Sequence, residues 1–137
     1  MARIRLDHIG IAVNSLDDGE KFWKMLGLTS DEDDETNHEQ GVNIRFLKTS
    51  DLSQPPQIEL LSPTSSDTPV GKFIEKRGQG VQQLAFEVDD LQTMIDELLD
   101  SGIQMIDKTP KAGANGAKIA FVHPKSTGGV LVELLEK

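Results

Sequence analysis

Cysteine is absent from this 137-residue chain, and so are long runs of apolar residues. Without cysteine the chain can form no disulfides, thiolate metal sites or cysteine nucleophiles. No stretch approaches the roughly 20 apolar residues of a bilayer-spanning helix. The first segment, MARIRLDHIGIAV, has no long apolar core followed by a small-residue cleavage site, as a signal peptide would have. We therefore interpret it as a strand and expect a cytoplasmic protein.

Positive charge is scarce, because 14 lysine and arginine residues stand against 23 acids and give a formal net charge of −9. This balance disfavours nucleic acid and anionic membranes as partners. Part of the acidity lies in the run DEDDE at 31–35, which we interpret as a solvent-exposed loop. The proportions of hydrophobic residues, 36%, and charged residues, 27%, are typical of a folded domain.

The sequence repeats itself at an offset of about 75 residues. LDHIGIAVNSL aligns with VQQLAFEVDDL, GVNIRFLK with GAKIAFVH, and QIELL with LVELL after a slip of one residue. An offset that holds across so many landmarks indicates a duplication. We predict a single domain over 1–137, with repeat one at 3–63, a linker at 64–78 that contains a short helix, and repeat two at 79–137.

Each repeat has the pattern of one strand, one helix and three further strands. Ser15 can cap the first helix, and Asp89 or Asp90 can cap the second. Gly27 and Gly102 stand where left-handed C-terminal caps are expected. Helical spacing predicts two apolar stripes that pack on the strands: Phe22, Met25 and Leu26 in repeat one, and Leu91, Met94, Ile95 and Leu98 in repeat two. The order is β-α-β-β-β twice, which is an α+β fold.

Four polar residues occupy strand positions that point away from the predicted helices. The repeat aligns His8 with Gln83 on the first strands and Glu59 with Glu133 on the last strands. Two halves related by a pseudo-twofold axis would bring these side chains together in one cleft. An imidazole, an amide oxygen and two carboxylates suit a divalent ion such as Co²⁺, Mn²⁺, Ni²⁺, Zn²⁺ or Mg²⁺. The sequence therefore predicts a metal site.

LDHIGIAV, EQGV, QIELLSP, GVQQLAFEVDDL and KIAFVHPKSTGGVLVEL, together with the repeat, resemble the methylmalonyl-CoA epimerases of the vicinal-oxygen-chelate (VOC) superfamily. The likeness covers nearly the whole chain, and HPKSTGGVLVEL is its most specific part. It implies the glyoxalase (VOC) fold, in which two tandem βαβββ modules form a curved mixed sheet around a metal-binding cleft. The metal positions of the family fall on His8, Glu59, Gln83 and Glu133, with Gln82-Gln83 where the epimerases have His-His.

The resemblance implies a metal-dependent epimerase that interconverts (2R)- and (2S)-methylmalonyl-CoA by removing the proton next to the thioester. Its base is Glu39 of the HEQGV segment, whose repeat mate is Ala114. Glu133 is the candidate for proton transfer on the opposite face while it also binds the metal, and His38 and His123 are alternatives. Co²⁺ is the favoured ion. One-base and two-base mechanisms both remain open.

The resemblance also implies an acyl-CoA substrate and a homodimer. Lys125 is the candidate contact for a CoA phosphate, with Lys111 and Lys118 as further candidates. Three other interpretations remain open: a glyoxalase-I-type isomerase, a non-enzymatic small-molecule-binding VOC protein, and a purely structural βαβββ domain. The sequence also leaves open whether the two halves pair within the chain or across a dimer. Gln83 either weakens metal binding or marks a different substrate.

Overall fold

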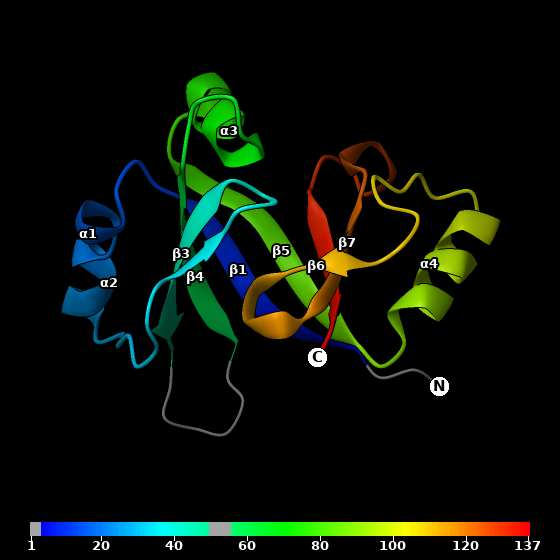
Figure 1. Cartoon of the computed structure of the whole chain (residues 1–137), viewed down its shortest axis with the longest axis horizontal. Helices are drawn as coiled ribbons and strands as arrows, with labels where there is room; N and C mark the ends of the chain where they lie inside the picture. The colour runs from blue at the N-terminus through cyan, green and yellow to red at the C-terminus, as the bar shows by residue number, and fades with distance from the viewer. Residues whose placement is uncertain (1–3, 50–55) are drawn as a thin grey trace. The chain divides into compact units, whose positions relative to one another are not determined.

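The computed structural model describes residues 4–49 and 56–137 (Figure 1). Its regular elements follow the order β-α-β-β-β twice, which confirms the predicted α+β class, and the helix predicted in the linker is α3. The elements of the first repeat are β1 (Ile4–Ala12), α1 (Leu16–Gly19), α2 (Lys21–Leu26), β2 (Glu35–Asn37), β3 (Val42–Lys48) and β4 (Gln57–Pro63). They are followed by α3 (Pro69–Arg77), β5 (Gly80–Val88), α4 (Leu91–Asp100), β6 (Lys111–Ala112), the 3₁₀ turn η1 (Ala114–Gly116), β7 (Lys118–Val122), the 3₁₀ turn η2 (Pro124–Ser126) and β8 (Val132–Glu136).

The chain divides into two compact units. The N-terminal unit is residues 8–82, and its strands have the order β2-β3-β4-β1, with β4 parallel to β1 and antiparallel to β3. The C-terminal unit is residues 4–7 with 83–137, and its strands have the order β5-β8-β7-β6, with β8 parallel to β5 and antiparallel to β7. The two strand orders match repeat for repeat, as a duplication requires.

The first residues of β1 belong to the C-terminal unit, where an ion-pair network holds their side chains. One guanidinium nitrogen of Arg5, Nη1, lies 3.0 Å from a carboxylate oxygen of Asp7 and 3.0 Å from one of Glu87. The ammonium of Lys137, near the end of β8, lies 2.7 Å from Asp7. Alternating charges therefore tie the start of β1 to β5 and to the last residue of the chain.

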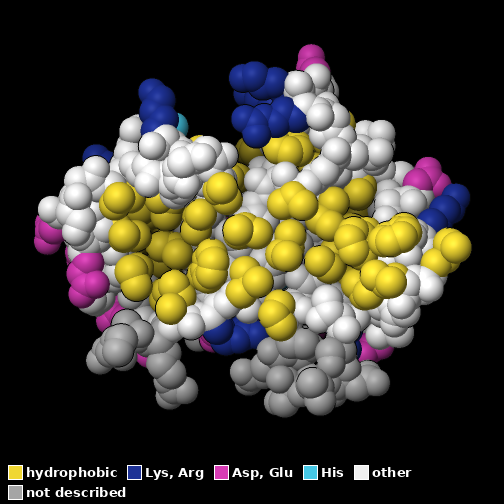
Figure 2. Space-filling model, turned by 180° about the vertical axis from the view of Figure 1, so that it is seen from behind, with side chains coloured by type: hydrophobic (Ala, Val, Ile, Leu, Met, Phe, Trp, Pro, Cys, Tyr) yellow, Lys and Arg dark blue, Asp and Glu magenta, His cyan; other side chains and the backbone are white. Residues whose placement is uncertain are grey.

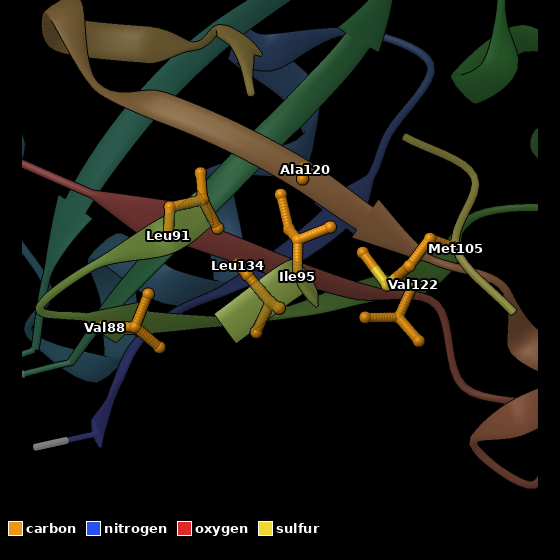
Figure 3. Close-up of a cluster of buried hydrophobic side chains, with 7 residues drawn as sticks. All are labelled: Val88, Leu91, Ile95, Met105, Ala120, Val122 and Leu134. Atoms are coloured by element: carbon orange, nitrogen blue, oxygen red, sulfur yellow. The ribbon is translucent and has the colours of Figure 1, made fainter. Parts of the chain in front are cut away.

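Helix α4 packs on the C-terminal unit as its sequence predicts. Asp90 caps it by accepting a hydrogen bond of 3.1 Å from the backbone N–H of Thr93, and Gly102 follows its end with a positive φ of 87°. Leu91 and Ile95 are fully buried. Figure 3 shows them in the cluster of apolar side chains formed by Val88, Leu91, Ile95, Met105, Ala120, Val122 and Leu134.

The helix of the first repeat departs from its prediction. Ser15 caps it as expected, by accepting a hydrogen bond from Asp18 N at 3.3 Å, but the helix is interrupted after Gly19 and forms α1 and α2. The backbone of Gly19 lies so close to the side chain of Val13, the residue after β1, that a Cβ there would lie 2.6 Å from it. Leu16 and Trp23 then cover the apolar core of this unit.

The stripe predicted for repeat one is therefore wrong. Phe22, Met25 and Leu26 are 62%, 87% and 62% exposed, because the break after Gly19 turns them away from the strands. Figure 2 shows hydrophobic side chains at the surface on the side of the molecule that carries α1 and α2. None of the helices in the described ranges is long and apolar enough to cross a membrane.

Candidate functional site

His8 and Glu59 form a buried polar pair in the N-terminal unit. In the parallel register of β1 and β4, Gly10 lies opposite Glu59 and His8 lies opposite Gln57. Because Gly10 adds no side chain, Glu59 can reach diagonally along the same face to His8. The Nδ1 atom of His8 lies 3.1 Å from Oε2 of Glu59. The two residues are only 4% and 6% exposed.

Gln83 and Glu133 repeat this construction in the C-terminal unit. Ala85 lies opposite Glu133 in the parallel register of β5 and β8, and Phe121 lies opposite it on β7. Gln83 donates a hydrogen bond of 2.8 Å from Nε2 to Oε1 of Glu133, and each of the two residues is 7% exposed. Within each unit, the structure brings the predicted ligand residues together as a pair.

Each of the two pairs offers donor atoms that suit a divalent cation. Carboxylates as deeply buried as those of Glu59 and Glu133 are found where they are paired or bind a metal, because the charged form loses its hydration. His8 contacts its carboxylate through Nδ1 and so directs Nε2 elsewhere. Gln83 donates through its nitrogen, which directs its amide oxygen elsewhere. The residues present therefore fit the metal that the resemblance implies.

Asp7 is a further acidic residue that the sequence did not single out. Strand alternation assigns it to the face opposite His8, yet a carboxylate oxygen of Asp7 lies within 4.8 Å of a ring nitrogen of His8. Its side chain is held by Arg5 and Lys137 at 3.0 and 2.7 Å. The signal that could have found it is a carboxylate among the apolar residues that alternate along β1, directly before a candidate ligand.

Glu39, the predicted base, lies in the turn of residues 38–41 that joins β2 to β3. Its side chain is exposed. The turn is ordered by Asn37, whose side-chain oxygen accepts a hydrogen bond of 3.0 Å from Gln40 N. In the C-terminal unit, the matching connection between β6 and β7 contains η1, where Ala114 takes the place of the acid. Only one of the two repeats therefore carries a carboxylate at this position.

Lys125, the predicted phosphate contact, lies in η2 and is exposed. The backbone N–H of Lys125 donates a hydrogen bond of 3.0 Å to Nδ1 of His123, so the imidazole orders this loop. The two other candidate lysines are engaged with acids: Lys111 lies 3.1 Å from Asp107, and Lys118 lies 4.0 Å from Glu136. Lys125 is thus the candidate with its ammonium most available to a ligand.

The βαβββ repeats and the paired ligand residues define a class of protein. The chain belongs to the glyoxalase/bleomycin resistance protein/dioxygenase superfamily, whose family model matches residues 7–121.

Within that superfamily the chain is similar to methylmalonyl-CoA epimerases. It is 36% identical to the mitochondrial methylmalonyl-CoA epimerase of Dictyostelium discoideum, over 97% of this chain and 78% of the relative. A solved methylmalonyl-CoA epimerase in complex with methylmalonyl-CoA and NH₄⁺ is 38% identical and covers 97% of this chain and 94% of its own, with a TM-score of 0.90. An uncharacterized protein of Bacillus subtilis is 45% identical over 96% of this chain and 91% of its own. These similarities confirm the resemblance to methylmalonyl-CoA epimerases and the VOC fold.

Proposed function

We propose that the protein is a metal-dependent epimerase that interconverts (2R)- and (2S)-methylmalonyl-CoA. The observation that carries the proposal is the pair of buried contacts, 3.1 Å between His8 and Glu59 and 2.8 Å between Gln83 and Glu133. They occur in a chain that shares 38% of its residues with an epimerase solved with methylmalonyl-CoA. A structural domain would have no use for two carboxylates buried in this way.

The residues proposed to hold the metal are His8, Glu59, Gln83 and Glu133. Co²⁺ is the ion we favour, and Mn²⁺, Ni²⁺, Zn²⁺ and Mg²⁺ are alternatives with the same preference for oxygen and nitrogen donors. A bound divalent ion would stabilise the thioester oxygen, where negative charge develops as the neighbouring carbon loses its proton.

Glu39 is proposed to accept the proton from that carbon. A carboxylate is a competent general base when it is held near the acidic carbon, and the turn of residues 38–41 fixes its place in the N-terminal unit. Glu133 is proposed to exchange a proton on the opposite face, with the orientation of its carboxylate held by the hydrogen bond from Gln83. Lys125 would contact a phosphate of the CoA moiety as a point charge.

The experiment that tests this function is deuterium incorporation at carbon 2 of methylmalonyl-CoA in D₂O, followed by mass spectrometry. We expect rapid incorporation by the metal-loaded protein, its loss after treatment with a chelator, and its return when Co²⁺ is added. Methylglyoxal with glutathione is the parallel substrate. Turnover of that substrate without any exchange on methylmalonyl-CoA would overturn the proposal in favour of a glyoxalase-type isomerase.

A second experiment tests whether one ion is bound by both pairs. His8→Ala and Glu133→Ala remove one ligand from each pair, and each is expected to lower the metal content from about one ion per chain to near zero. Gln57→Ala is the control, because Gln57 lies opposite His8 in the register of β1 and β4. If either variant keeps its full metal content, the single-ion assignment fails.

We further propose that the protein is a homodimer. Phe22, Met25 and Leu26 of α2 expose an apolar surface of a kind that often marks protein contacts. Analytical ultracentrifugation should give a mass of twice the 15.0 kDa of one chain. A monomer at micromolar concentration would contradict this part of the proposal.

A further inference from the structure

The turn that carries Glu39 rests against the first turn of α3. Gly41, the last residue of the turn, has a φ of +66°, and its carbonyl oxygen accepts a hydrogen bond of 2.9 Å from Thr64 N. A Cβ atom at Gly41 would overlap Cγ2 of Thr68 and would lie 3.1 Å from its Cβ. The backbone of the turn therefore touches the side chain of Thr68 directly.

Thr68 is locked in place by its own hydrogen bonds. It is the N-cap of α3, and its Oγ1 accepts a hydrogen bond of 3.1 Å from Gly71 N. The same hydroxyl donates a hydrogen bond of 2.8 Å to the carbonyl oxygen of Ser65. Because these two bonds fix the side-chain rotamer, they also fix the Cγ2 methyl group against Gly41.

The helix behind Thr68 is itself anchored. Val70 and Gly71, in the first turn of α3, are both buried. A Cβ at Gly71 would lie 2.5 Å from the carbonyl oxygen of Ser65, so the helix backbone sits directly on the segment that follows β4. That segment donates the hydrogen bond from Thr64 to Gly41. The turn is thus held between β3, which it leads into, and the capped end of α3.

We infer that Thr68 is a positioning residue for the proton transfer at Glu39. Its methyl group sets where the turn of residues 38–41 can lie within the N-terminal unit, the unit that also contains Glu59. This inference rests on the proposed function, in which Glu39 is the base. Displacing a catalytic group by about 1 Å can lower a rate by about 100-fold, so a contact of this kind controls the rate without touching substrate.

The first test is Gly41→Ala, whose new methyl group must push the turn and Thr68 apart. We expect kcat for deuterium exchange to fall about 30-fold to 100-fold, with KM changed less than about threefold and the metal content unchanged. Gly116→Ala is the matched control. Gly116 is the repeat mate of Gly41, has a similar φ of +74°, and has open space where the Cβ would lie. It should keep kcat within about twofold.

The second test is rescue by Thr68→Ser, which keeps the capping hydroxyl and removes only the methyl group. In the double variant with Gly41→Ala, we expect kcat to recover about tenfold over Gly41→Ala alone. Alone, Thr68→Ser should lower kcat about threefold, because the turn loses its support. The inference is overturned if Gly41→Ala behaves like Gly116→Ala in kcat, or if Thr68→Ser leaves the Gly41→Ala defect unchanged.

A measurement of stability separates this inference from the proposed function. Whether or not methylmalonyl-CoA is the substrate, Gly41→Ala should lower the melting temperature by about 5 °C more than Gly116→Ala, and Thr68→Ser should restore most of that difference. Suppose that Thr68→Ser restores the melting temperature of Gly41→Ala, but the wild-type protein exchanges no proton of methylmalonyl-CoA. The proposed function is then wrong, whereas the contact between Gly41 and Thr68 is supported. If the wild-type protein exchanges the proton but Thr68→Ser does not restore the melting temperature of Gly41→Ala, only the positioning role of Thr68 is wrong.

Discussion

The two repeats differ in how one matching strand position contacts the helices: it is apolar in the C-terminal unit and charged in the N-terminal unit. In the C-terminal unit, Ala120 on β7 is fully buried in the apolar cluster with Leu91 and Ile95 of α4 (Figure 3). The matching position on β3 of the N-terminal unit is Arg45. Its guanidinium lies 2.9 Å from Asp17 on α1, 3.2 Å from Glu20, which joins α1 to α2, and 2.8 Å from Asp34 before β2.

This contrast shows that an ionic network can take the place of an apolar contact at one strand position, while Leu16 and Trp23 still pack on the apolar cluster of their unit. Arg45 forms a bidentate pair with Asp34 through Nε and Nη2, which lowers the pKa of the Asp34 carboxyl and raises the pKa of the guanidinium. Arg45 offers α2 no apolar partner at this position, and Trp23 makes the contact of α2 with the apolar cluster of this unit. Phe22, Met25 and Leu26 remain exposed.

The largest effect we expect comes from Glu39, whose repeat mate is Ala114. Glu39→Gln should lower the rate of deuterium exchange about 100-fold to 10,000-fold while the metal content stays the same, because it removes the proposed general base and none of the proposed metal ligands. Glu32→Gln, an exposed acid of the same repeat, is the control and should change little. Unchanged exchange in Glu39→Gln would exclude Glu39 as the base.

The next effect tests the two helices directly. Ile95→Ala in α4 removes a fully buried side chain and should lower the free energy of unfolding by about 2–5 kcal/mol. Lys21→Ala in α2 changes a side chain that is 74% exposed and lies outside the proposed dimer surface, and it should cost less than about 0.5 kcal/mol. Urea denaturation measures both. Equal losses would mean that α2 packs more closely than its exposure indicates.

A smaller effect comes from making the two ligand pairs alike. Gln83→His replaces the amide of the C-terminal unit with the imidazole found at His8, and nitrogen is a stronger donor to ions such as Co²⁺ and Zn²⁺ than an amide oxygen. We expect metal affinity to rise about tenfold, or about 1.4 kcal/mol, in a competition titration with a coloured chelator. A fall in affinity, or no change, would argue that Gln83 does not bind the metal.

The smallest effect concerns pH and the ionic network. The pKa of Asp34 is lowered in the folded protein by its hydrogen bonds to Arg45. The stabilisation from this pair is therefore complete above the unfolded pKa of about 4 and is lost as the pH falls through the lower folded value. Asp34→Asn should reduce stability at pH 7 by less than about 1 kcal/mol, because the Asp34 side chain is 43% exposed and solvent screens it.

The pH dependence is measured by urea denaturation between about pH 2.5 and pH 7. The difference between the wild-type protein and Asp34→Asn should shrink as the pH falls below about 4. Asp33→Asn, at an exposed neighbouring position, is the control. A difference that is independent of pH would show that the loss comes from packing and not from the charge of Asp34.

The features that the sequence predicted correctly rest on local signals. Helices begin at the predicted caps Ser15 and Asp90 and end at the predicted glycines Gly27 and Gly102. These positions were predictable because a cap depends on a few neighbouring residues. Strand alternation, which has a period of two, also assigned His8 and Glu59 to one face of the N-terminal unit. The constant offset of the repeat then carried the same assignment to the second pair in the C-terminal unit.

The features that the sequence did not predict depend on contacts distant along the chain. Helical periodicity assigned Phe22 to a core, but it could not reveal that Arg45, 23 residues later, occupies the matching surface of β3. Residues 31–34 of the acidic run are exposed as predicted, whereas Glu35 is half-buried and begins β2. Asp34 binds that same arginine. The sequence also did not predict the contact between Gly41 and Thr68. A glycine in a turn does not reveal which distant side chain occupies the place of its missing Cβ.

The membership of β1 in both units limits how the duplicated chain can be divided. Residues 4–7 are bound to Glu87 and Lys137 through Arg5 and Asp7, whereas residues 8–12 pair with β4. A gene cut within the linker would leave the second fragment without the tetrapeptide that neutralises the charges at its strand ends. Fragment complementation should therefore succeed only when that tetrapeptide is supplied with the C-terminal piece.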